Sequence, residues 1–218
     1  MMIEEFFISN VYVRSQTLTA RLGDILRQIE ALYGQRDRDF TILGVEFHPS
    51  VSCLYFPSDS NTKVMPECKQ VIISIDSSCQ NDPLRVYGSL AHECIHLLSP
   101  RVGQASFLEE GLAVSFSLSY MQRFTGHRMT SVGHPLYDQA MVLFERAEFI
   151  YPDLIRRVRG LHQGRLSDLV VEWMREALPS LPEDLLSSLT EEFPSQFSVQ
   201  PLEISQHSNP TFMERQTI

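Results

Sequence analysis

Two histidines and a glutamate stand in the pattern H-E-x-x-H at His92, Glu93 and His96. Residues four apart lie about one turn apart on the same face of an α-helix, so both imidazoles can reach one metal ion. Glu93 points from a neighbouring face, where its carboxylate can meet a metal-bound water rather than the metal itself. The spacing therefore predicts a Zn²⁺ site in which His92 and His96 are ligands.

The residues around this pattern favour a buried helix. Asp82 is a candidate N-cap, Pro83 suits the first helical position, and Pro100 disfavours helix in the residue before it. Two histidines in a buried helix need polar partners, which a metal ion would supply. The alternative is a pair of core histidines with ordinary hydrogen bonds, or a structural domain in which the motif arose by chance. The flanking apolar residues are Val86, Tyr87, Leu90, Ala91, Ile95, Leu97 and Leu98.

A second helix is expected shortly downstream. Ser106 and Glu109 have the S-x-x-E spacing of a capping box, which occupies Glu109 and leaves Glu110 free to point elsewhere. Because only a few residues separate Pro100 from this start, a short loop would fold the second helix back against the first. A catalytic zinc keeps three protein ligands and one water, so a third ligand is required. His127 and His134 are weaker candidates for that third position.

The two segments together resemble the gluzincin metallopeptidases, which are thermolysin-like zinc enzymes of the peptidase MA type. The resemblance lies in His92-Glu93-x-x-His96 followed by Glu110-Gly111-Leu112-Ala113, because the glutamate helix of that family often reads E-G-[FL]-A. It covers about residues 70–120 and implies that Glu110 is the third zinc ligand and that Glu93 is the general base. The metzincin alternative fails, since Ser99 stands where that family has glycine and no third histidine follows at the required spacing.

One residue departs from the family pattern. Thermolysin-like members often carry an aspartate one turn after the ligand glutamate, where it orients the first histidine, and this chain has Val114 there. The support of the ligands must then come from elsewhere, and Ser115 and Ser117 are the candidates. Besides a metallopeptidase, the sequence allows a second function, that of a catalytically inactive zincin-fold scaffold or protein-interaction module that binds zinc. The missing aspartate favours this alternative.

Amide hydrolysis also needs a donor for the developing oxyanion. The resemblance selects Tyr151, because some gluzincins carry such a tyrosine after the helix that follows the glutamate helix. The contrary interpretation is that a tyrosine before proline packs and has its hydroxyl satisfied. The other candidate donors are Tyr120, His127, His134 and Tyr137.

Composition limits the class of protein. The chain has 218 residues, 43% of them hydrophobic, a net charge of −9 and a pI near 5.2. The acidic balance argues against nucleic acids and anionic membranes as partners. The sequence also contains no apolar run of about 20 residues, the length needed to span a bilayer. The first residues lack the basic and apolar regions of a signal peptide, so we expect a cytoplasmic protein. The four cysteines, Cys53, Cys68, Cys79 and Cys94, form no C-x-x-C pair, and a Cys68–Cys79 disulfide is disfavoured in a reducing compartment.

Hydrophobic periodicity predicts an α+β fold with a small mixed or antiparallel N-terminal sheet. We expect a helix over 17–33 and strands over 6–14, 40–47, 51–56 and 70–75, the middle two joined as a hairpin around 48–50. The strand at 70–75 is either central or at the edge. By the resemblance, an edge strand would pair with an extended substrate backbone.

Helices dominate the remainder of the chain. We expect them over 135–149, from Tyr151-Pro152 to about 160, over 167–177 with Ser167 as cap, and over 182–193. In the helix over 167–177, the side chains that should face inward are those of Leu169, Val170, Trp173 and Ala177. Arg156, Arg157 and Arg159 form a basic cluster that is either a solvated face or a carboxylate site. The predicted layout is one domain over 1–193, with a sheet lobe (about 1–80) and a helical lobe (81–193), followed by a flexible tail over 194–218.

These observations together favour a zinc-dependent metallopeptidase, a hydrolase acting on peptides or proteins, with the site between the two lobes.

Overall fold

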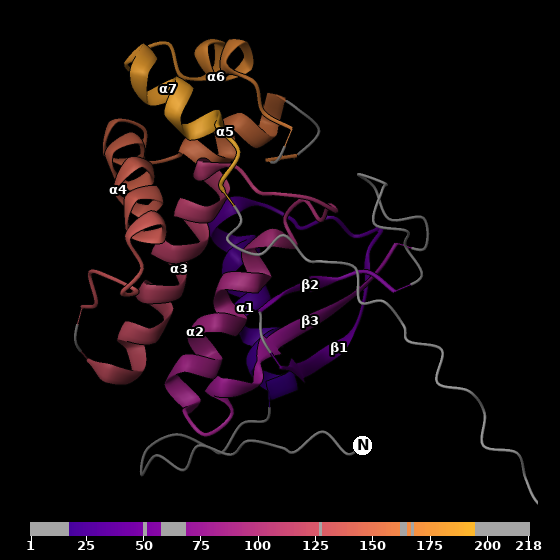
Figure 1. Ribbon diagram of the computed structural model, residues 1–218. Helices are drawn as coiled ribbons and strands as arrows, with labels where there is room; N and C mark the ends of the chain where they lie inside the picture. Colours follow the sequence, from indigo (N-terminus) through magenta and orange to yellow (C-terminus); the bar gives the residue numbers. More distant parts are fainter. Residues whose placement is uncertain are drawn as a thin grey trace, which may run out of the picture.

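The computed structural model describes residues 18–49, 52–57, 69–126, 128–161, 165–166 and 168–194, and these form a mixed α+β arrangement as expected (Figure 1). No helix within these ranges is long and apolar enough to cross a membrane. The elements are α1 (Leu18–Tyr33), β1 (Thr41–His48), β2 (Cys53–Tyr55), β3 (Gln70–Asp76), a 3-10 turn (Ser77–Cys79), α2 (Pro83–His96), α3 (Phe107–Thr125), α4 (Pro135–Ile150), α5 (Leu154–Leu161), α6 (Val171–Ala177) and α7 (Glu183–Thr190).

The three strands have the order β1-β3-β2, with β1 parallel and β2 antiparallel to β3. The predicted hairpin between the first two strands is therefore wrong, because each of them pairs with β3 instead. The central place of β3 follows from its composition. Val71, Ile73 and Ile75 are fully buried, and a strand so rich in β-branched residues gains most from neighbours on both edges.

The apolar face of β3 shares one continuous core with α1 and α2. Ile25 and Ile29 of α1 and Leu90 of α2 are completely buried in that core. β2 and β3 both pack against α2, so the sheet supports the helix that carries the H-E-x-x-H pattern.

The C-terminal helices lie where the sequence pattern predicts them, but α5 starts at Leu154 rather than at 151, α7 ends at Thr190 rather than at 193, and α6 differs most. This helix starts at Val171 rather than 167, and its N-cap position, Val170, makes no side-chain capping bond. The inward stripe predicted there is wrong for Val170 and Trp173, which are 42% and 38% exposed, while Met174 and Leu178 are buried. Because the helix starts later than predicted, Met174 and Leu178 face the core in place of Val170 and Trp173. The proposed cap Ser167 lies outside the described residues.

Two arginines of the predicted basic cluster bind main-chain oxygens instead of a ligand. Arg156 donates through Nε to the carbonyl of Leu32 (2.7 Å) and through its terminal nitrogen to that of Ala31. Arg159 donates to the carbonyls of Tyr33 (2.7 Å), Gln35 (2.6 Å) and Leu98 (3.3 Å). The last carbonyls of a helix lack partners within it, and α5 supplies them for the end of α1. Arg157 instead pairs with Asp153 at 2.7 Å.

Several predictions concern segments outside the described residues. These are the strand over 6–14, Cys68, His127 and the tail beyond residue 194. Cys53, Cys79 and Cys94 are free thiols.

Candidate metal centre

The helix α2 presents both histidines of the pattern on one face. Asp82 caps it as predicted, since its Oδ1 accepts hydrogen bonds from the amides of Leu84 (3.1 Å) and Arg85 (3.2 Å). The helix ends at His96. One turn apart, the rings of His92 and His96 have centroids 5.2 Å from each other.

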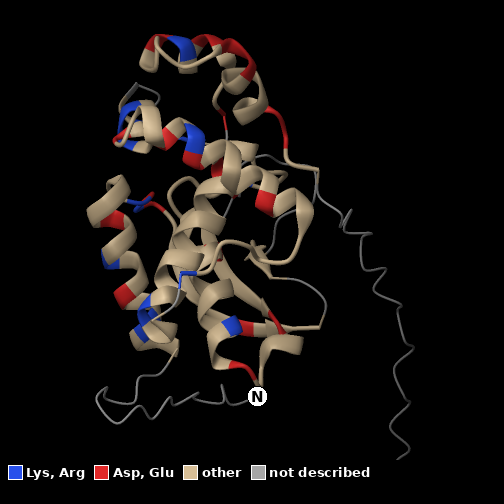
Figure 2. Cartoon of the chain, turned by 90° about the vertical axis from the view of Figure 1, so that its left-hand side faces the viewer, with Lys and Arg blue, Asp and Glu red and all other residues tan. Residues whose placement is uncertain are grey.

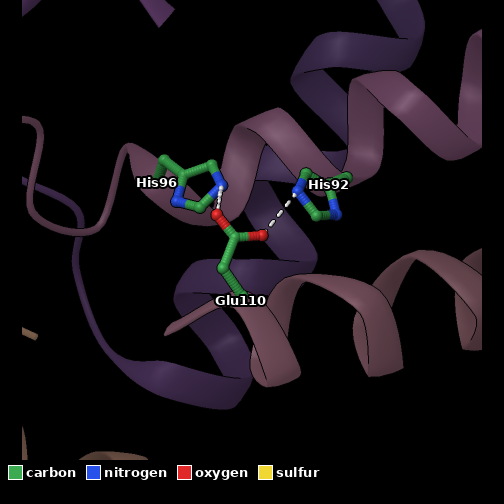
Figure 3. A group of neighbouring side chains, drawn as sticks. All are labelled: His92, His96 and Glu110. Atoms are coloured by element: carbon green, nitrogen blue, oxygen red, sulfur yellow. Dashed lines mark ion pairs between the residues drawn. The ribbon is translucent and has the colours of Figure 1, made fainter. Parts of the chain in front are cut away.

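The helix α3 brings a carboxylate to the same place. Ser106 caps its start by accepting a hydrogen bond from the amide of Glu109 at 3.3 Å, as the capping pattern predicts. Glu110 extends from the first turn toward α2 and ends between the two imidazoles (Figure 3). Its Oε2 lies 3.2 Å from Nε2 of His92, and its Oε1 lies 3.7 Å from Nε2 of His96.

These distances suit a shared divalent ion. Two ligands of a tetrahedral Zn²⁺, with bonds of about 2.1 Å, lie about 3.4 Å apart. The ligand atoms of His92, His96 and Glu110 all lie within 4.8 Å of one another, and within the described residues no other group of three or more histidine, cysteine or carboxylate side chains is so close. Apart from its ion-pair contact with His92, the buried Oε2 of Glu110 has no hydrogen-bond partner there, and a cation would satisfy it. The three residues therefore fit a metal ion, whereas the weaker candidate His134 is not in the cluster.

A glycine allows α3 to lie close to α4 immediately after the candidate ligand. A Cβ at Gly111 would come within 2.3 Å of the carbonyl oxygen of Ala140 and 2.7 Å of Cβ of Phe144. Such distances are closer than any real contact, so only glycine fits. Glycine follows the candidate ligand Glu110 because α4 packs directly against the turn of α3 from which Glu110 projects.

The support of His96 comes from a residue that sequence reasoning gave another role. Glu109, assigned only to the capping box, places Oε1 2.8 Å from Nδ1 of His96, and its side chain is 3% exposed. Because a carboxylate accepts, Nδ1 of His96 donates to it, which leaves Nε2, on the side of Glu110, as the ring nitrogen available to a metal ion. Ser117, one of the two expected supports, donates its hydroxyl to the carbonyl of Val114 in its own helix. The sequence signal that could have indicated that Glu109 supports His96 is the adjacent acidic pair Glu109-Glu110 at the start of α3.

The pKa values of two buried glutamates shift in opposite directions, since that of Glu93 is raised and that of Glu110 is lowered. Burial raises the pKa of Glu93, against the effect of the two imidazoles, and the charge of Glu110 adds to the rise. Glu110 is also buried, but the imidazoles of His92 and His96 outweigh burial and lower the pKa of its carboxyl. A glutamate with a raised pKa next to one with a lowered pKa is the division expected between a proton acceptor and a ligand.

We expect a pH-dependent contribution of the His96–Glu109 pair to the stability of the metal-free protein. Burial opposes protonation of His96, but the hydrogen bond to Glu109 and the charges of Glu110 and Glu93 raise its pKa from 6.5 to about 10. The contribution should be complete below about pH 6.5 and disappear as the pH rises toward 10. Thermal unfolding of chelator-treated protein across this range measures it. Glu109→Gln should flatten the pH dependence, and an unchanged profile would contradict the assignment.

Of the candidate oxyanion donors, Tyr137 rather than Tyr151 lies beside the cluster. The Tyr137 ring is 5.8 Å from that of His92, and burial, followed by the charges of Glu110 and Glu93, raises the pKa of its hydroxyl. The hydroxyl of Tyr151 instead accepts a hydrogen bond from the amide of Ser180 at 2.9 Å, which is a packing role. The other candidates within the described residues are Tyr120, whose hydroxyl donates to Asp24 (3.3 Å), and His134, whose ring is 5.2 Å from that of Tyr137.

Comparison of the chain with protein-family models, with curated proteins and with solved structures finds no match in any of the three. The gluzincin resemblance therefore depends on the motifs at 92–96 and 110–113.

Proposed function

We propose that this protein is a zinc-dependent metallopeptidase of the gluzincin type that hydrolyses peptide bonds. The observation that carries the proposal is the convergence of His92 and His96 from α2 with Glu110 from α3, next to the buried carboxylate of Glu93. In this interpretation α2 is the active-site helix of a zincin, α3 is the glutamate helix, and α4 to α7 form the helical lobe.

The donor set favours zinc among the common divalent ions. Two imidazole nitrogens and one carboxylate oxygen are the ligands of known catalytic zinc sites, whereas Mg²⁺ and Ca²⁺ prefer oxygen alone. A zinc ion held there would lower the pKa of water and polarise the scissile carbonyl.

The residues around the ion then have distinct roles. The Glu93 carboxylate accepts a proton from the attacking water and passes it to the leaving amine. Glu109 fixes the ring of His96 through Nδ1, so that Nε2 stays free to bind. The hydroxyl of Tyr137, which has no hydrogen-bond partner within the described residues, donates to the developing oxyanion.

A peptide substrate would lie along the edge of the sheet. Within the described residues, β2 forms one edge, and it packs against α2. Burial, followed by the charges of Glu93 and Glu46, raises the pKa of Cys53 on β2 to about 11, so this strand lies within electrostatic reach of the proposed base. An extended backbone added to β2 would place its carbonyl groups near Glu93.

A zinc-binding scaffold without turnover is the second candidate. One observation favours it: Val114, in place of the expected aspartate, packs with Leu118 and Met141 and offers no acceptor to His92. The ring of His92 meets Tyr137 edge-on instead.

Metal analysis of the purified protein tests the ligand assignment. We expect one zinc ion per chain, and we expect His92→Ala and Glu110→Gln each to remove it, because three protein ligands are the minimum for such a site. His48→Ala, at the end of β1, is the matched control and should keep the metal. Full zinc content in either ligand variant would contradict the proposal.

Hydrolysis itself is tested with a mixed peptide library. Zinc-loaded protein should produce new amino termini, a chelator should stop their formation, and added Zn²⁺ should restore it. Zinc binding without any cleavage would favour the scaffold over the peptidase.

A further inference from the structure

The helix α4 has a second face that the metal centre does not use. Ala140, Phe144 and Ala147 are buried on its inner side, next to α3. On the outer side Val142 is 50% exposed and Phe149 is 87% exposed. An aromatic ring presented to solvent to this extent, close to other apolar side chains, is typical of an interaction surface.

A groove runs beside this outer face, between α4 and α7. It has a volume of about 510 Å³. Figure 2 shows the molecule from this side, with α4 facing the viewer. The residues that line the groove are Val142, Glu145, Arg146, Phe149, Ile150, Pro182 and Leu185.

Two opposite charges stand side by side in the middle of this surface. The side chains of Glu145 and Arg146 form no ion pair or hydrogen bond within the described part of the chain, and burial, followed by the charge of Glu145, raises the pKa of the neighbouring Glu148. A partner that supplies one cation and one anion at the same spacing would neutralise both charges.

A second copy of α4 has this complementary order. When two identical helices cross antiparallel at a two-fold axis between positions 145 and 146, position 145 of each copy faces position 146 of the other. The same axis places position 142 opposite position 149. Glu145 would therefore meet Arg146 twice, and each exposed Phe149 would enter the groove beside Val142 of the other copy. A two-fold interface requires such a self-complementary patch.

We propose that the outer face of α4, with the groove bordered by α7, is a homodimer interface in which Phe149 of each copy fills the groove of the other. The proposal does not depend on the metallopeptidase function, because it uses no residue of the metal centre.

Sedimentation analysis or light scattering of the zinc-loaded full chain over a range of concentrations tests the interface. The wild type should be a dimer, and Phe149→Glu should raise the dissociation constant by about 30-fold or more, as expected for a central aromatic anchor. The matched control is Leu32→Glu on α1, whose side chain is 50% exposed and which should leave the dimer intact. Circular dichroism and zinc content should be unchanged in both variants, which separates dissociation from unfolding.

Charge exchange provides a test that a general loss of hydrophobicity cannot imitate. Glu145→Arg and Arg146→Glu should each weaken the dimer, because like charges then meet twice across the axis. The double variant E145R/R146E should regain most of the affinity, since the reciprocal pairs are restored. A monomeric wild type, a dimer insensitive to Phe149→Glu, or a double variant as weak as the singles would each overturn the proposal.

Discussion

Replacement of Glu93 by glutamine is expected to lower peptide hydrolysis by about 10³-fold and to leave the zinc content unchanged. Glutamine has nearly the same shape but cannot accept the proton of the attacking water. Glu93 is 5% exposed, and it does not belong to the cluster of three ligand atoms. The variant should therefore fold, bind metal and lose turnover, with the loss in kcat rather than in KM.

The control for this variant is Glu172→Gln, which makes the same chemical change at an exposed position of α6 and should retain full activity. Zinc content and thermal unfolding are measured on both proteins beside the cleavage rate. Full hydrolysis by the Glu93→Gln protein would refute the assigned base. A glutamine variant that loses zinc as well would make Glu93 a ligand or a structural residue.

The substitution Gly111→Ala is expected to destabilise the fold by about 2–3 kcal/mol, which is large for a single methyl group. Alanine gains about 1 kcal/mol of helix propensity over glycine, so the packing cost must exceed that gain. It should do so because the new Cβ would lie 2.3 Å from the main-chain oxygen of Ala140, which cannot rotate away as a side chain can. Pushing α4 from α3 would also displace Glu110, so we expect weaker zinc binding. Denaturant unfolding and zinc titration measure the two effects.

Gly160→Ala is the matched control for Gly111→Ala, because it makes the same change at another helical glycine. Gly160 lies in α5, and a Cβ there would meet nothing within 4 Å. Only the propensity term remains, so this variant should be neutral or up to about 1 kcal/mol more stable. Equal unfolding free energies for the two alanine variants would show that the contact between α3 and α4 is not as tight as described.

The helix α2, which carries two of the candidate metal ligands, was predictable because its signals are local. Asp82 and Pro83 mark its start, and the spacing of His92 and His96 alone places both rings on one face. These features depend on residues a few positions apart and on helix geometry, not on the remainder of the chain.

The missed features depend on contacts between distant segments. Whether 40–47 pairs with 51–56 or with 70–75 is decided by which strand the core covers, and the turn between the first two strands could not reveal that. In the same way, Glu109 was recognisable as a helix-start residue, but its contact with His96 requires the angle at which α3 returns to α2. Tyr137 was one of several tyrosines until α4 was placed against α3.

The bonds from Arg156 and Arg159 to main-chain oxygens have a consequence for which substitutions the protein tolerates. Their acceptors belong to Ala31, Leu32, Tyr33, Gln35 and Leu98, more than sixty positions away in sequence, yet none of the contacts involves the side chains of those residues. Sequence drift at the acceptor positions would leave these bonds intact as long as the backbone keeps its course. The donors have no such freedom, because lysine lacks the planar fork that reaches several carbonyls at once. Natural variants should therefore change freely along 31–35 at exposed side chains and retain arginine at 156 and 159.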